Sequence, residues 1–134
     1  MHLPDGRRGC VMVILILKNW TFRNMLKAQL EEEGFEVFAI EYSDESAGFR
    51  EHDGLLLRSG ELIVLYLMDG GYAMEKLRAI KKIAGNVPFL ILRGTVGISD
   101  RTLRDEGFNF ILRRPFSIGD IVKEVKNAVD KFPR

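Results

Sequence analysis

Three basic residues come at or just after the ends of mostly apolar segments, and their placement bears most directly on chemistry. They are Lys18, Arg93 and Arg114. In a parallel α/β sheet, ligands and catalysis are found where strands end and helices begin. The sequence therefore predicts a basic rim at the carboxyl ends of the strands, formed by these three side chains.

Cations gathered at such a rim need partners, because two unit charges about 6 Å apart repel by roughly 3 kcal/mol at an effective dielectric near 20. Three arrangements are open. The side chains can splay outward into solvent. They can bind an anion such as phosphate, a nucleotide or an acidic side chain of a partner, which nearby helix N-termini would also favour. They can be neutralised internally, and the candidate carboxylates for this are Glu41, Asp44, Asp69 and Asp100.

The remaining reactive residues do not form a catalytic or metal-binding pattern. His2 and His52 are far apart and have no partner at ligand spacing, and Cys10 has no paired histidine motif. The Tyr66 hydroxyl is a poor nucleophile here, so its ring is expected to line the core or a pocket wall. Asp69 is the carboxylate nearest to Tyr66 in the sequence, but no pair of acidic residues accompanies it. We therefore expect neither an enzyme nor a cofactor.

The composition is that of an ordinary globular protein, with 46% hydrophobic and 29% charged residues among 134. A formal net charge of +1, from 20 basic and 19 acidic residues, gives no general electrostatic case for nucleic-acid or membrane binding. No apolar run approaches the roughly 18 residues of a bilayer span. A single cysteine fits a reducing cytoplasm. We expect residues 1–10 to form a loose tail and residues 11–134 a single domain.

Apolar runs and helical periodicity alternate along the chain, which predicts a parallel sheet with helices on both faces. The predicted strands are Val11–Leu17, Phe35–Ile40, Leu62–Met68, Pro88–Leu92 and Phe108–Leu112. The predicted helices are Thr21–Glu33, a helix from Ser43 or Asp44 to about Glu51, Tyr72–Ala84, Ser99–Glu106 and Ser117–Lys131. Leu55–Leu57 is either the last turn of the second helix or a short extra strand.

Capping residues and the apolar stripe define the ends and faces of these helices. Thr21 and Ser99 are predicted N-caps, and Gly34 and Gly107 are placed to end the preceding helices. Trp20 is expected to be a packing residue. The buried stripe of the first helix is predicted to comprise Phe22, Met25, Leu26 and Leu30.

Two segments carry a resemblance to a known family. One is Phe22–Val37, a first helix and second strand with Arg23, Gly34 and Phe35 at characteristic places. The other is Gly107–Ser117, which contains Arg-Arg-Pro-Phe before an amphipathic helix. Over nearly all of residues 11–132 the chain resembles the receiver domain of two-component response regulators. The resemblance implies a flavodoxin-like fold with sheet order 2-1-3-4-5 and a cis peptide bond before Pro115.

The resemblance also implies that the phosphorylation site is degenerate. The two metal-binding acidic positions correspond to Leu17 and Lys18. The phosphoacceptor aspartate corresponds to Tyr66, or to Leu65 in a neighbouring register. The remaining family positions are the hydroxyl residue after the fourth strand, the lysine and the switch aromatic, which correspond to Arg93, Arg114 and Ile111 (Phe110 is adjacent). Mg²⁺ requires hard oxygen ligands and phosphoryl transfer requires a carboxylate acceptor, so phosphorylation is not expected.

These observations favour a cytoplasmic, phosphorylation-independent pseudo-receiver that signals through protein–protein contact. The candidate partners are a histidine kinase or an output protein acting in trans. A second copy of the chain could also bind, through the face formed by 99–106, 108–112 and 117–131. The alternative is a sensor of anions or small ligands that uses the basic rim.

Overall fold

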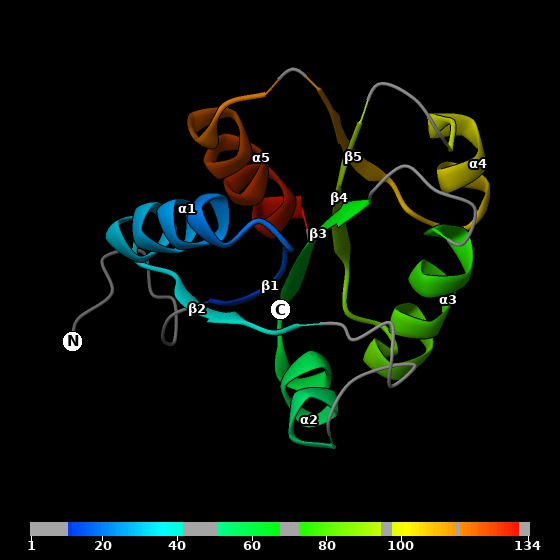
Figure 1. Cartoon of the computed structure of the whole chain (residues 1–134), viewed down its shortest axis with the longest axis horizontal. Coiled ribbons are helices and arrows are strands. Elements are labelled where there is room, and N and C mark those ends of the chain that lie inside the picture. The colour runs from blue at the N-terminus through cyan, green and yellow to red at the C-terminus, as the bar shows by residue number, and fades with distance from the viewer. Residues whose placement is uncertain (1–10, 42–50, 68–72, 95–97, 115, 132–134) are drawn as a thin grey trace.

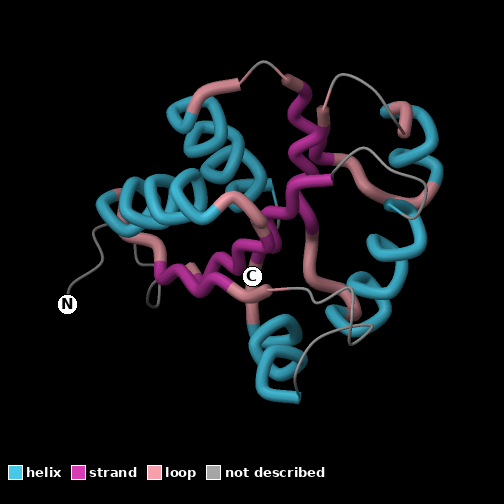
Figure 2. Tube along the Cα trace, in the orientation of Figure 1, coloured by secondary structure: helices cyan, strands magenta, loops and turns pink. Residues whose placement is uncertain are grey.

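The computed structural model describes residues 11–41, 51–67, 73–94, 98–114 and 116–131 (Figure 1). Within these ranges the chain forms five strands and five helices. They alternate along the chain, as the apolar pattern predicts (Figure 2). The strands are β1 (Met12–Ile16), β2 (Glu36–Ala39), β3 (Leu62–Leu67), β4 (Phe89–Arg93) and β5 (Phe110–Arg113). The helices are α1 (Trp20–Glu32), α2 (Glu51–Ser59), α3 (Ala73–Ala84), α4 (Asp100–Asp105) and α5 (Ile118–Lys131).

All five strands are parallel and form one sheet in the order β2-β1-β3-β4-β5. This is the flavodoxin-like doubly wound order that the resemblance implies. Figure 1 shows α1 and α5 on one side of the sheet and α2, α3 and α4 on the other. Because the strands run in the same direction, their carboxyl ends meet at a single edge of the sheet.

The core has two layers, one on each face of the sheet. The layer under α1 and α5 takes Val13, Leu15, Val64 and Leu92 from the strands, and the layer under α2, α3 and α4 takes Ile14, Ile16, Leu65 and Ile91. Adjacent residues of a strand therefore belong to opposite layers, as the two-residue period of a strand requires. Strands buried on both faces explain why their sequences are continuously apolar rather than alternating.

The start of α1 differs from the prediction. The N-cap is Asn19, whose Oδ1 accepts a hydrogen bond from Phe22 N at 2.9 Å, so the predicted cap Thr21 lies inside the helix. Trp20 and Met25 were expected to pack, but they are 66% and 57% exposed. The cause is that α1 buries only the row that begins at half-buried Phe22 and continues with Leu26 and Leu30 against β2 and α5.

The second helix extends beyond the predicted end near Glu51. Leu55–Leu57 lies inside α2, which removes the alternative of an extra strand. Gly54 lies within this helix and is buried, and a Cβ built there would be 3.7 Å from Ile83 of α3. The helix therefore continues through a glycine because α2 packs against α3 there and against β1. The proposed caps Ser43 and Asp44 lie outside the described residues.

The last two strands begin and end later than predicted. β4 includes Arg93, and β5 begins at Phe110 rather than Phe108. Phe108 is buried before the strand, with its ring edge-on to Phe89 at 5.3 Å between centroids. Ser99 caps α4, and Gly34 and Gly107 adopt φ values of +95° and +97° after α1 and α4, as predicted.

Candidate functional site

The carboxyl edge of the sheet places the strand ends side by side. Tyr66 of β3 is level with Leu92 of β4, and Arg93 is level with Arg113 of β5. Lys18 follows β1 directly and is exposed. These positions lie at the same edge of the sheet, but the faces of the sheet on which the side chains lie divide them into two groups.

One group lies on the face covered by α1 and α5. The Tyr66 ring is half-buried and edge-on to Phe116, with 6.4 Å between centroids and 79° between planes. The Arg114 guanidinium lies over the same ring, 5.6 Å from its centroid. Phe22 of α1 also contacts Phe116, at 6.4 Å. Tyr66 is thus part of an aromatic wall with a cation above it, which matches the packing role expected from the sequence.

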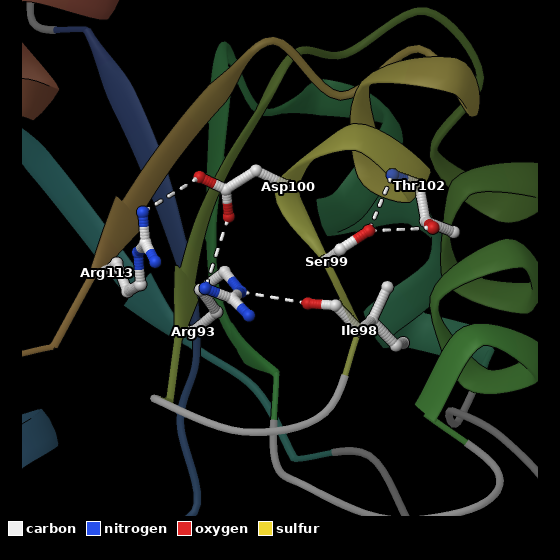
Figure 3. A network of polar contacts seen from close by, with 6 residues as sticks. All are labelled: Arg93, Ile98, Ser99, Asp100, Thr102 and Arg113. Atoms are coloured by element: carbon white, nitrogen blue, oxygen red, sulfur yellow. Dashed lines mark hydrogen bonds and ion pairs between the residues drawn. The ribbon is translucent and has the colours of Figure 1, made fainter.

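The other group lies on the face of α4, and Arg93 is its centre (Figure 3). Only 7% of the Arg93 side chain is exposed. Its Nε donates a hydrogen bond to Ile98 O at 2.9 Å, and its Nη1 is 3.2 Å from Asp100 Oδ1. Internal neutralisation by Asp100 is therefore the arrangement that the structure shows for this cation. Glu41, another predicted counter-ion, instead lies 3.5 Å from Arg23, and Asp44 and Asp69 are outside the described residues.

Asp100 is shared between two strands through its second oxygen. Its Oδ2 lies 3.8 Å from Nη2 of Arg113, so one carboxylate stands between β4, β5 and the start of α4 (Figure 3). The neighbouring Ser99 accepts from Thr102 N at 3.2 Å and contacts the Thr102 hydroxyl at 2.9 Å, which fixes the first turn. Arg113 precedes Arg114 in the Arg-Arg-Pro-Phe segment, and its place beside Asp100 follows from its register with Arg93, which the sequence alone does not reveal.

The predicted basic pocket of Lys18, Tyr66, Arg93 and Arg114 is therefore not one cluster. Tyr66 and Arg114 are in contact, whereas the Arg93 side chain is withdrawn to the opposite face. Ile111, the predicted switch position, is half-buried beside the layer under α2, α3 and α4. Pro115 lies outside the described residues, so the expected cis bond stays a prediction.

Neither a metal centre nor a membrane helix emerges from the part of the chain that the structure describes. Its histidine, cysteine and carboxylate side chains nowhere gather in a group of three that could hold an ion. In the same residues no helix combines the length and the apolar character needed to cross a bilayer.

The fold is that of response regulator receiver domains. The non-phosphorylated HemR receiver domain of Leptospira biflexa is similar over 92% of this chain and 97% of its own, with 20% identity and a TM-score of 0.70. A CheY-like receiver domain protein of Methanospirillum hungatei is similar over 92% and 96%, with 14% identity and a TM-score of 0.68.

A response regulator of Burkholderia multivorans is similar over 93% of this chain and 99% of its own, with 22% identity and a TM-score of 0.60. No family model matches the chain, and no curated protein matches it. At these identities, the comparisons establish the fold that the chain shares with these proteins.

Proposed function

We propose that the chain is a non-enzymatic signalling module of the receiver type that acts through protein–protein contact without being phosphorylated. The observation that carries this proposal is the chemistry of the carboxyl edge of the sheet. By the resemblance to receivers, Leu17, Lys18, Tyr66 and Arg93 correspond to positions where a receiver needs carboxylates and a hydroxyl. Without carboxylates at these four positions, they supply neither Mg²⁺ ligands nor a phosphoryl acceptor.

The burial of Arg93 and its ion pair with Asp100 also support this proposal. A cation at this edge would favour a phosphoryl anion if its guanidinium were available, but Arg93 is buried and already neutralised by Asp100. The fold is retained while the side chains at the reactive edge pack against each other, as Tyr66, Phe116 and Arg114 do. A conserved scaffold with an altered site is a common route to a new role.

The partners follow from this role. We propose that the module works in the cytoplasm with a histidine kinase or an output protein in trans, or pairs with a second copy of itself. The surface proposed for these contacts is the face of α4, β5 and α5. Its described residues include Arg101 and Arg104 on α4 and Arg113 on β5, all exposed.

The experiment is incubation with a small acyl-phosphate donor and Mg²⁺, followed by intact-protein mass spectrometry. An ordinary receiver domain serves as the positive control and Asp69→Asn as the matched variant. We expect no phosphorylated species. A modified protein, or a Mg²⁺-dependent change in backbone NMR shifts beside β3, would overturn the proposal. Modification lost in Asp69→Asn would identify that residue as the acceptor.

The alternative role as an anion sensor depends on Lys18 and Arg114, which are exposed at this edge. Titration with inorganic phosphate and with nucleotides, followed by NMR, separates the two roles. The signalling proposal expects the amides near Lys18 and Arg114 to stay unchanged at millimolar ligand. Saturable shifts at both residues would favour the sensor.

A further inference from the structure

The position of α4 cannot be explained by helix propensity or by apolar packing alone. Asp100–Asp105 is six residues long, and Leu103 is its one fully buried side chain. Isolated helices of this length are unstable in water, so tertiary contacts must hold such a segment in place. Polar contacts at the two ends of α4 therefore add to the packing of Leu103 in holding the helix in place.

The C-terminal end of α4 is attached to α3. Arg78 donates from Nε and Nη2 to the two carboxylate oxygens of Glu106, at 3.0 and 3.1 Å. Lys81 Nζ donates to Glu106 O at 2.9 Å and lies 4.7 Å from the centroid of the Phe108 ring. These contacts are exposed or half-buried, and they lie at the far end of the helix from the carboxyl edge of the sheet.

The N-terminal end of α4 is attached to the end of β4 by one side chain, Arg93. Its guanidinium reaches two points, Ile98 O at 2.9 Å and Asp100 Oδ1 at 3.2 Å. Among the described residues, Arg93 is the only charged one that is buried. The Asp100 contact is an ion pair without hydrogen-bond geometry. The Asp100 side chain is 24% exposed, so the cost of breaking the pair falls on Arg93, whose buried charge would be left without this partner in a low dielectric.

Arg113 is a weaker neighbour of the same carboxylate. It lies 3.8 Å from Asp100 Oδ2, and 60% of its side chain is exposed. Exposed ion pairs of this length contribute little to stability. Asp100 is therefore held mainly by Arg93, and Arg113 is left at the surface of β5 beside the start of α4.

We propose that Arg93 is a positioning residue that holds the N-terminal end of α4 beside β5 in one fixed arrangement. The surface of α4 and β5 is then preformed for a partner. The positioning follows from the contacts in the free chain. Only the use of this surface for binding rests on the proposed function.

Hydrogen exchange of the isolated protein, without partner or phosphodonor, tests the proposal. The variants are Arg93→Met, which keeps the length of the side chain but removes the charge, and Arg93→Lys, which keeps the charge but loses the planar fork. We expect the α4 amides to exchange at least about tenfold faster in Arg93→Met, with Arg93→Lys intermediate and α5 unchanged. The matched control Arg113→Met should exchange like the parent protein.

Two results would overturn the positioning role. One is unchanged exchange in α4 of Arg93→Met. The other is an equal acceleration in α4 and α5, because this would reflect lower global stability rather than local release of one helix.

A second set of variants keeps the test decisive if Arg93→Met does not fold. Asp100→Asn should accelerate α4 exchange by itself, and Arg93→Lys with Asp100→Asn should exchange no faster than the more affected single variant. Independent, multiplying effects would show that Arg93 does not act through Asp100. Phosphorylation of the protein with α4 still fixed by Arg93 would contradict the proposed function and leave this inference standing.

Discussion

At the scale of single residues, the direction of each side chain at the sheet edge decides what the edge can do. Arg93 and Arg114 both follow apolar segments, and the sequence alone suggests that they share a pocket. Yet Arg93 belongs to the face of Ile91 and α4, whereas Arg114 lies over Tyr66 on the face of α1 and α5. The two-residue period of a strand tells which of its side chains share a face of the sheet. Relating the faces of β3, β4 and β5 to one another also requires their register, which no single strand reveals.

Substitutions at Tyr66 test whether this residue is a structural aromatic. Tyr66→Phe keeps the ring contacts with Phe116 and Arg114 and should change the free energy of unfolding by less than about 0.5 kcal/mol. Tyr66→Ala removes both contacts from a half-buried site and should cost about 2 kcal/mol. Urea denaturation followed by circular dichroism measures both. Equal losses in the two variants would mean that the hydroxyl, rather than the ring, matters.

At the scale of elements, the alternation of strands and helices was predictable, and most of the inaccuracy lies at their ends. Asn19 and Thr21 are both good caps two residues apart, and residue type alone does not choose between them; in the structure Asn19 has the extended backbone of a cap. The continuation of α2 through Gly54 depends on its contact with α3, which local propensity does not contain. The exposure of Met25 depends in the same way on which face of α1 the sheet and α5 cover.

Alanine is expected to have opposite effects at two glycines, Gly54 inside α2 and Gly60 just after its end. A Cβ at Gly54 would make ordinary contacts at 3.7 Å inside a helix, so Gly54→Ala should stabilise the protein by about 0.5–1 kcal/mol. A Cβ at Gly60 would lie 2.7 Å from Cγ1 of buried Ile14, so Gly60→Ala should destabilise it by about 1–3 kcal/mol. Thermal unfolding of the pair provides the comparison, and a loss of stability in Gly54→Ala would contradict the α2–α3 packing.

The contact between α3 and the end of α4 predicts a pH dependence of stability. Hydrogen bonds from Arg78 lower the pKa of the Glu106 carboxyl below its ordinary value, and the same contact raises the pKa of Arg78. A carboxyl whose pKa is lower in the folded state stabilises the fold above its unfolded pKa of about 4.3. That contribution is lost as the pH falls through the folded pKa.

Removing this carboxylate should therefore flatten the acid side of the stability profile. We expect Glu106→Gln to lower the Tm at pH 7 and to lose less Tm than the parent protein between pH 7 and pH 3, as measured by calorimetry at both pH values. Glu124→Gln on α5, whose carboxyl forms no ion pair with another described residue, is the matched control. Parallel profiles for Glu106→Gln and the parent would contradict the role of this contact.

At the scale of the whole molecule, the sheet separates two surfaces that the sequence places in one site. On one side, Tyr66, Phe116 and Arg114 close the edge with aromatic packing. On the other, Arg93 and Asp100 join the sheet to α4. Described residues of the carboxyl edge are thus engaged in packing and in an ion pair, and the contacts of the proposed signalling role are assigned to the outer face of α4, β5 and α5.

Self-association through the face of α4, β5 and α5 should depend on salt. Arg113 is exposed on β5, and Arg104 lies one helical turn beyond Asp100, on the side of α4 that contacts Arg113. In a twofold interface the same patch meets its own copy, so these arginines would repel each other across it. Salt screens such repulsion, with a Debye length that falls from about 10 Å at 0.1 M to about 3 Å at 1 M.

We therefore expect sedimentation velocity to show a monomer at low ionic strength and a growing dimer fraction as salt is added. Arg104→Glu should dimerise at lower salt than the parent, because its new carboxylate can pair with Arg113 of the second copy. Arg58→Glu on α2, far from this face, is the matched control and should behave like the parent. A dimer that forms at low salt and dissociates as salt rises would show that opposite charges hold it together, and would exclude an arginine-bearing self-interface.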